Sequence, residues 1–160
     1  MRFLCLVVLF LGSNAFAKDL SNRLGVGYSN QFGVSSDMPS IAMRYYPNAD
    51  YGLMGAIGVD TEDKNSRFGF GAKIMKIVFR EDNLNFYTAA SAGIVSRELN
   101  GKNDSGFDLS GLVGAEFFLP GLENLGWSFE AGVGVTSISS QVRFRTIGDS
   151  PLRAGMIFYF

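Results

Sequence analysis

Six charged residues stand within segments that are otherwise apolar or built of small residues. An isolated charge is costly to bury, whereas opposite charges that pair and accept hydrogen bonds are tolerated. Each residue falls on the less apolar side of a segment in which every second residue is apolar, so we expect all six to share one buried face. The predicted lumen charge network has three cations and three anions: Arg44, Lys73, Asp108, Glu116, Glu130 and Arg153.

These charges suggest two kinds of chemistry inside a narrow barrel. They could form salt bridges that plug the interior, or a gate that selects small solutes. We favour the plug, because side chains just fill the interior of an eight-stranded barrel. Closure would place the last strand beside the first and near the second, so Glu130 is expected to pair with Arg44 or Arg153.

Catalytic and cofactor chemistry find little support in the sequence. Histidine is absent, so a general base would have to be a carboxylate or a lysine tuned by burial. The Gly-x-Gly pairs neither continue to a third glycine nor open a helix, which argues against a phosphate-binding loop. The acidic stretch 60–65 lacks the glycine and terminal glutamate of a calcium loop. We predict no enzyme, no catalytic residue, no metal and no cofactor, and no basic patch points to nucleic acid.

Eight segments alternate large apolar residues with small or polar ones, the period of a half-buried strand. Eight strands of about ten residues leave room for seven connections and for no second domain. We therefore predict an all-β fold, an eight-stranded antiparallel up-and-down transmembrane β-barrel. The predicted strands are residues 23–32, 40–46, 51–60, 67–79, 84–96, 106–118, 126–137 and 152–160.

The predicted connections alternate in length, as they do in membrane barrels, whose short turns lie on one side and longer loops on the other. An even number of strands puts both termini on the short-turn side. The limits of the last loop stay open, because residues 142–146 also alternate and could extend the neighbouring strands. The short turns are 47–50, 81–83 and 120–124, and the longer loops are 33–39, 61–66, 97–105 and 138–151.

The N-terminus has the features of a secretory signal peptide. Arg2 is followed by an apolar run that is too short to span a bilayer, and residues 15–17 read Ala-Phe-Ala before Lys18. We expect cleavage after residue 17, which leaves a barrel domain of residues 18–160. Cys5 is lost with the peptide, so the mature chain can form no disulfide. Its 13 basic and 15 acidic residues give a net charge of −2.

Composition favours a membrane barrel over a soluble one. Charged residues make up 18% of the chain, below the roughly 25% of soluble domains. No later stretch is apolar for long enough to form a membrane-spanning helix. Without helices, only a closed barrel provides every backbone N–H and C=O group in lipid with a hydrogen-bond partner. A soluble lipocalin-like carrier would turn the apolar face inward, but the opposite face consists of Gly, Ala and Ser with isolated charges. That face has too few charged side chains to be the water-exposed outside of a soluble barrel.

The final strand resembles the C-terminal insertion signal of bacterial outer-membrane β-barrels through a polar residue, a glycine and two aromatics, namely Arg153, Gly155, Phe158 and Phe160. The mature chain resembles small barrels of the OmpA and OmpX type in architecture. The resemblance implies a Gram-negative outer-membrane location, contact with outer-membrane lipids, and recognition of the C-terminal strand by the barrel-assembly machinery. It names no ligand for the surface loops.

Aromatic residues cluster at the ends of the predicted strands, as they do in interfacial girdles. The predicted girdle residues are Phe32, Tyr45, Phe68, Phe86, Phe107, Phe117 and Trp127. The sequence thus predicts an outer-membrane barrel with a plugged polar lumen that acts through surface loops or as a structural envelope component. A narrow channel for small solutes is the alternative, and the lack of histidine disfavours a lipid-modifying enzyme.

Overall fold

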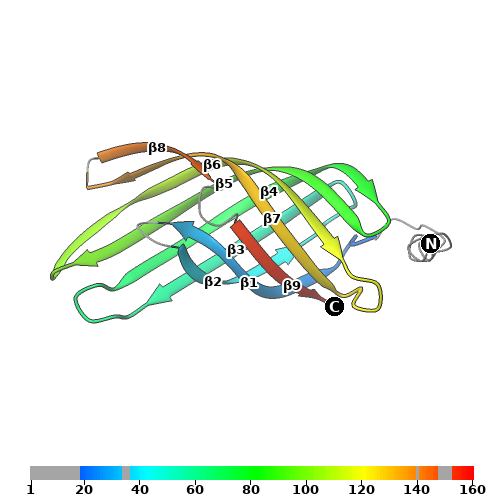
Figure 1. The fold of residues 1–160 in the computed structure, drawn as a ribbon, viewed down its shortest axis with the longest axis horizontal. Coiled ribbons are helices and arrows are strands. Elements are labelled where there is room, and N and C mark those ends of the chain that lie inside the picture. The colour runs from blue at the N-terminus through cyan, green and yellow to red at the C-terminus, as the bar shows by residue number, and fades with distance from the viewer. Residues whose placement is uncertain (1–18, 34–36, 140, 148–152) are drawn as a thin grey trace, which may run out of the picture.

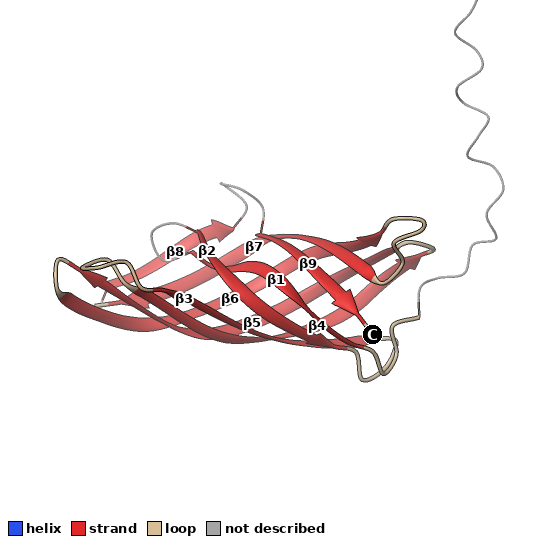
Figure 2. Ribbon diagram, turned by 90° about the horizontal axis from the view of Figure 1, so that it is seen from below, coloured by secondary structure: helices blue, strands red, loops and turns tan. Residues whose placement is uncertain are grey.

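The structure is a computed structural model that describes residues 19–33, 37–139, 141–147 and 153–160. Strands dominate this part of the chain (Figure 2), and no helix in it is long and apolar enough to cross a membrane. The predicted signal peptide, residues 1–17, lies outside the described residues. The strands are β1 Leu24–Gly33, β2 Asp37–Tyr45, β3 Tyr51–Asp60, β4 Arg67–Glu81, β5 Leu84–Leu99, β6 Lys102–Phe118, β7 Leu125–Ile138, β8 Gln141–Ile147 and β9 Arg153–Tyr159.

Eight of these strands close into an antiparallel barrel with up-and-down neighbour order, which confirms the predicted all-β fold (Figure 1). Strands β1 to β7 each pair with the next strand in the sequence, and β9 pairs with both β7 and β1. The closing ladder runs from Gly25 opposite Tyr159 to Ser29 opposite Gly155. Over the residues that pair, β1 and β9 therefore have no unpaired edge.

Strands β8 and β9 share one position in the wall. Strand β7 pairs with β9 over Leu125 to Glu130 and with β8 over Gly132 to Ile138. The loop predicted over 138–151 is therefore wrong in its first half, where the alternation of residues 142–146 marks a strand. In the described part of the chain, β8 pairs only with β7. Strands β4 to β8 extend beyond the end of the β1–β2 hairpin (Figure 1).

The loop predicted over 97–105 is also wrong, because β5 and β6 continue to a tight turn at Asn100 and Gly101. Both residues have positive φ, 53° and 78°, as a type I′ hairpin turn requires. An Asn-Gly pair between alternating segments is a strong hairpin signal, and it was present in the sequence. The β5–β6 hairpin is consequently taller than predicted.

The strands turn large apolar residues outward and pack small and polar residues inside. Every second residue of β3 is buried along most of its length. Outward side chains such as Ile41, Phe70 and Val133 are 66%, 52% and 46% exposed. Inward glycines leave space for large side chains: a Cβ at Gly114 would lie 2.7 Å from Cζ of Tyr87. The inward Tyr87 ring therefore lies over Gly114, its cross-strand neighbour on β6.

Candidate functional site

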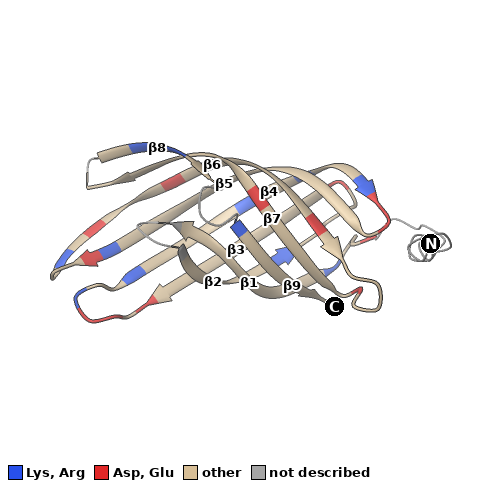
Figure 3. Ribbon diagram, viewed as in Figure 1, with Lys and Arg blue, Asp and Glu red and all other residues tan. Residues whose placement is uncertain are grey.

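The six charged residues predicted for the lumen all point inward, and each is at most 7% exposed. Figure 3 shows charges within the strands as well as at both ends of the barrel. Their contacts divide them into three clusters. Strand β6 carries Glu116 near the short-turn end and Asp108 nearer the loop end, and Glu130 of β7 lies between them in register, opposite Gly114. The clusters therefore follow one another along the barrel axis.

The lower cluster, at the short-turn end, is built around Glu116. Arg44 Nη1 lies 2.6 Å from Glu116 Oε1, and both side chains are fully buried. Tyr46 and Tyr159 donate their hydroxyl protons to the two carboxylate oxygens at 2.7 and 2.6 Å. Arg44 also reaches Ser128 Oγ at 3.4 Å. Three donors, two from the end of β2 and one from β9, thus converge on one carboxylate.

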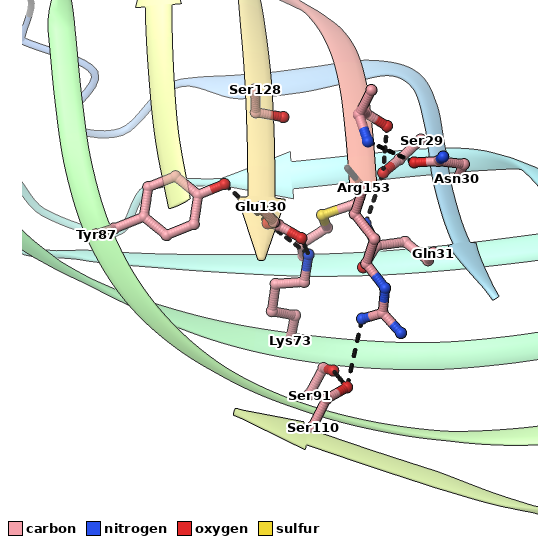
Figure 4. Close-up of polar contacts among 12 residues, drawn as sticks. Ser29, Asn30, Gln31, Lys73, Tyr87, Ser91, Ser110, Ser128, Glu130 and Arg153 are labelled. Atoms are coloured by element: carbon pink, nitrogen blue, oxygen red, sulfur yellow. Dashed lines mark hydrogen bonds and ion pairs between the residues drawn. The ribbon is translucent and has the colours of Figure 1, made fainter. Parts of the chain in front are cut away.

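The middle cluster pairs Lys73 of β4 with Glu130 of β7. Lys73 Nζ lies 2.7 and 2.5 Å from the two carboxylate oxygens, and the Tyr87 hydroxyl donates to Oε1 at 2.8 Å (Figure 4). The expectation that Glu130 would pair with Arg44 or Arg153 is wrong. Arg153 is the cross-strand neighbour of Glu130, but its guanidinium extends toward the loop end. Pairing across the lumen depends on strand stagger, which alternation does not reveal.

The upper cluster surrounds Asp108 near the loop end. Its carboxylate accepts hydrogen bonds from Thr136 Oγ1 at 2.7 Å and Ser110 Oγ at 3.2 Å. Two arginines flank it, Arg145 Nη2 at 3.3 Å and Arg153 Nη2 at 3.6 Å. Arg153 also donates to Ser110 at 3.3 Å. Longer distances and two competing cations make this cluster looser than the two below it.

One small cavity lies within the lumen beside these clusters. A cavity of about 20 Å³ lies among Phe32, Lys73, Asp108 and Arg153. A buried water requires roughly 10–15 Å³ of such volume, so this cavity has room for about one. Met75 and Ile157, which also point inward, are fully buried. These two side chains, like those of the three clusters, therefore occupy space inside the lumen.

The four residues of the predicted insertion signal divide between the two faces of β9 and its end. Arg153 and Gly155 face the lumen, whereas Phe158 and Phe160 are 52% and 67% exposed on the outside. Where the β1–β9 ladder ends, the Asn30 side chain accepts a hydrogen bond from the backbone N–H of Ala154 at 2.5 Å. A side-chain hydrogen bond thus links β1 and β9 beyond the last backbone pair of their ladder.

Six of the seven predicted girdle aromatics lie on the outer face. Tyr45, Phe68, Phe86 and Phe107 are exposed there, and Phe117 and Trp127 are half-buried on the same face. Phe32 is a correction, since it is 5% exposed and lines the lumen cavity. The β1–β2 register shifts between Ser29 and Phe32, and such a bulge reverses which face the following residues occupy.

Sequence reasoning missed several participants. Tyr46, Tyr87 and Tyr159 donate to the buried carboxylates, and the inward parity of Tyr87 and Tyr159 could have identified two of them. Arg145 was not predicted to face the lumen, because residues 138–151 were predicted to form a loop. On the outer face, Phe79 follows a second register shift, in β4, and Phe129 stacks on Phe117 with ring centroids 5.7 Å apart.

A scan against protein-family models found no match to this sequence, and a search of curated proteins found no significant match. The fold and the lumen geometry are therefore the basis for the function.

Proposed function

We propose that this chain is an outer-membrane β-barrel of the Gram-negative type, exported by a cleaved signal peptide, whose polar lumen is plugged. It acts through the loops and projecting strands at its loop end, or as a structural component of the envelope. Outer-membrane lipids and the barrel-assembly machinery are its proposed partners. The proposal includes no catalytic role and no cofactor.

One observation carries the membrane assignment: the two faces of the barrel have the opposite character to those of a soluble barrel. Large apolar side chains such as Ile41, Ile74 and Val113 stand outside, 66%, 52% and 48% exposed, while charged side chains are buried inside. Water would penalise so much exposed apolar surface, since soluble monomers rarely expose patches beyond a few hundred Å². A bilayer turns the same surface into a favourable contact.

The test of the outer face is Val133→Arg on β7, whose side chain is 46% exposed. An arginine near the bilayer midplane should make folding into lipid vesicles less favourable by about 2–4 kcal/mol. Thr136→Arg is not a suitable control, because Thr136 bonds Asp108 in the lumen. Ser105→Arg, on an exposed position near the loop-end turn of β6, should cost much less. Equal effects for Val133 and Ser105 would refute a lipid-facing belt.

The plugged lumen is supported by the three charge clusters and by the small cavity beside them. Single-channel recording of the protein in planar bilayers tests it, and we expect no steady conductance. The polar lining also favours a second candidate, a narrow channel for small solutes. Steady ion conductance in the unmodified protein, lost when the lumen is filled by Gly71→Phe, would establish the channel instead.

Recognition by the assembly machinery is proposed for the outward aromatics of the last strand. Deleting Phe160 should reduce the amount of protein in the outer membrane without blocking export across the inner membrane. Cell fractionation with immunoblotting measures both pools. The unboiled wild-type protein should also migrate faster than the boiled protein in a detergent gel. Normal outer-membrane levels of the deletion variant would contradict a role for Phe160 in assembly.

A further inference from the structure

A shallow apolar groove of about 770 Å³ lies on the outer face of the barrel wall, lined by residues of β3 to β8. Its floor follows one line of cross-strand neighbours, from Ile74 through Ala90 and Gly111 to Val133. Ile74 and Val133 are 52% and 46% exposed, so large side chains stand at both ends of a floor made of small residues. Four neighbouring strands make this line about 14 Å long at the usual strand spacing.

The glycine in this floor is not required by packing within the described part of the chain. A Cβ added at Gly111 would meet no atom within 4 Å, whereas a Cβ at the inward Gly114 would lie 2.7 Å from the Tyr87 ring. A glycine inside a strand weakens the strand and often marks a place where a ligand approaches the backbone closely. Gly111 therefore indicates that the floor is kept low for a group outside the barrel.

A lysine, Lys76, stands beside the groove on the same outer face, where its side chain is exposed. Along β4 its outward neighbours are Ile74, which lines the groove, and Val78, which is 59% exposed. Across the two ladders it lies opposite Tyr51 and Thr88. Lys76 is thus a charged residue inside the apolar belt. Charged side chains that face lipid are costly and usually mark a functional site.

The position of Lys76 in the belt suits a lipid headgroup at the short-turn end. No ion pair in the described part of the chain involves this lysine, and Asp50, next to Tyr51, is already 2.5 Å from Arg80. Toward the short turn, β4 ends at Glu81, and a lysine stem is long enough to carry its ammonium group from an apolar surface to the interface. The groove lies on the other side of Lys76, toward the loop end, which is the direction that acyl chains take from such a headgroup.

We propose that this face binds one anionic phospholipid of the leaflet at the short-turn end, with its phosphate on Lys76 and an acyl chain in the groove over Gly111. The lysine charge selects the anionic headgroup, and the groove is continuous with the lipid-facing belt. A second copy of the chain is a poorer occupant, because a symmetric contact would bring a second Lys76 and no counter-charge. The inference rests on the membrane location in the proposed function and adds a specific lipid site to it.

The test measures which lipid lies beside Lys76. The purified protein is folded into phosphatidylcholine vesicles that contain brominated phosphatidylglycerol or brominated phosphatidylcholine, which quench tryptophan fluorescence on contact. Trp127, the one tryptophan of the chain, is replaced by phenylalanine, and Thr88→Trp places a reporter next to Lys76. We expect the anionic lipid to bind this site about fivefold more tightly than phosphatidylcholine, the preference that one lysine near a membrane surface provides.

Two pairs of variants separate the headgroup contact from the groove. Lys76→Gln should abolish the preference for the anionic lipid, whereas Lys102→Gln removes the same charge at the other end of the barrel and should retain it. Native mass spectrometry of the protein with its own Trp127 should show one retained phosphatidylglycerol. Gly111→Phe fills the floor and should release this lipid, whereas Val26→Phe, on the outer face of β1, should keep it.

Equal binding of the two lipids, or a preference that survives Lys76→Gln, would overturn the proposal, because a lysine that only reaches water at the interface selects no lipid. Retention that survives Gly111→Phe would overturn it as well. A protein that retains no lipid but forms dimers that Gly111→Phe separates would replace the lipid with a second copy. Failure of the proposed function is seen separately, since a protein that prefers the anionic lipid in vesicles but is absent from the outer membrane on fractionation would refute only the location.

Discussion

The two ends of the lumen use the same chemistry at different degrees of burial. In the lower cluster Arg44 and Glu116 are 2.6 Å apart with no exposed side-chain surface. In the upper cluster Asp108 lies 3.3 Å from Arg145 and 3.6 Å from Arg153, with 7–21% of these side chains exposed. Breaking a pair is costly where the remaining charge cannot reach water. The comparison therefore predicts that removing a charge costs most stability in the lower cluster and least in the upper cluster.

The unequal height of the wall explains this difference. At the short-turn end all eight strands of the barrel surround the lumen, so Glu116 is enclosed on every side. At the loop end β1 stops at Gly33 and β2 starts at Asp37, while β5 and β6 continue to Leu99 and Lys102. Water can approach Asp108 and Arg145 over the shorter side of the wall.

Glu116→Gln should have the largest effect. It leaves Arg44 fully buried without its counter-charge, and removing one partner of a buried pair costs about 3–5 kcal/mol. Urea unfolding from lipid vesicles measures the loss. The double variant with Arg44→Met removes both charges and should recover part of the stability. A loss below that of the upper-cluster variant described below would contradict this order.

The middle cluster should show a specific coupling between Lys73 and Glu130. A double-mutant cycle of Lys73→Met with Glu130→Gln should give an interaction energy of about 0.5–3 kcal/mol, the range for residues in contact. The matched cycle of Glu130→Gln with Arg153→Gln should give less, because the structure places that guanidinium on Ser110 and Asp108. Equal couplings in the two cycles would mean that the three clusters act as one network.

Asp108→Asn should have the smallest effect. The asparagine keeps acceptor and donor groups for Thr136 and Ser110. Since 21% of the Arg145 side chain beside it is exposed, we expect a loss below the about 3–5 kcal/mol of a fully enclosed pair. The same unfolding assay, run in low and high salt, should show a loss that shrinks as salt screens the pair. A salt-independent loss as large as that of Glu116→Gln would show that the loop end is as well enclosed as the turn end.

Much of this arrangement follows from alternation alone. A period of two determines which face each strand residue occupies, and it placed all six charges inward because no bulge interrupts their strands nearby. It failed for Phe32, where the register shift in β1 reverses the face. It could not find the partner of Glu130, because pairing across the lumen depends on strand stagger. The alternation of residues 142–146 left the limits of the last loop open, and the structure places these residues in β8.

The last strand has a consequence for how the ring is completed. Tyr159 delivers a donor to Glu116 and Arg153 delivers a cation to Asp108, so β9 supplies a group to the clusters at both ends. It is also the last strand that the structure describes along the chain. The pairing of β9 with β1 and β7 therefore closes the ring and also brings these two groups to their clusters. A sheet without β9 would be open, and Glu116 and Asp108 would each lack one of their partners. Strand β9 thus couples the closure of the ring to the completion of the clusters at both ends of the lumen.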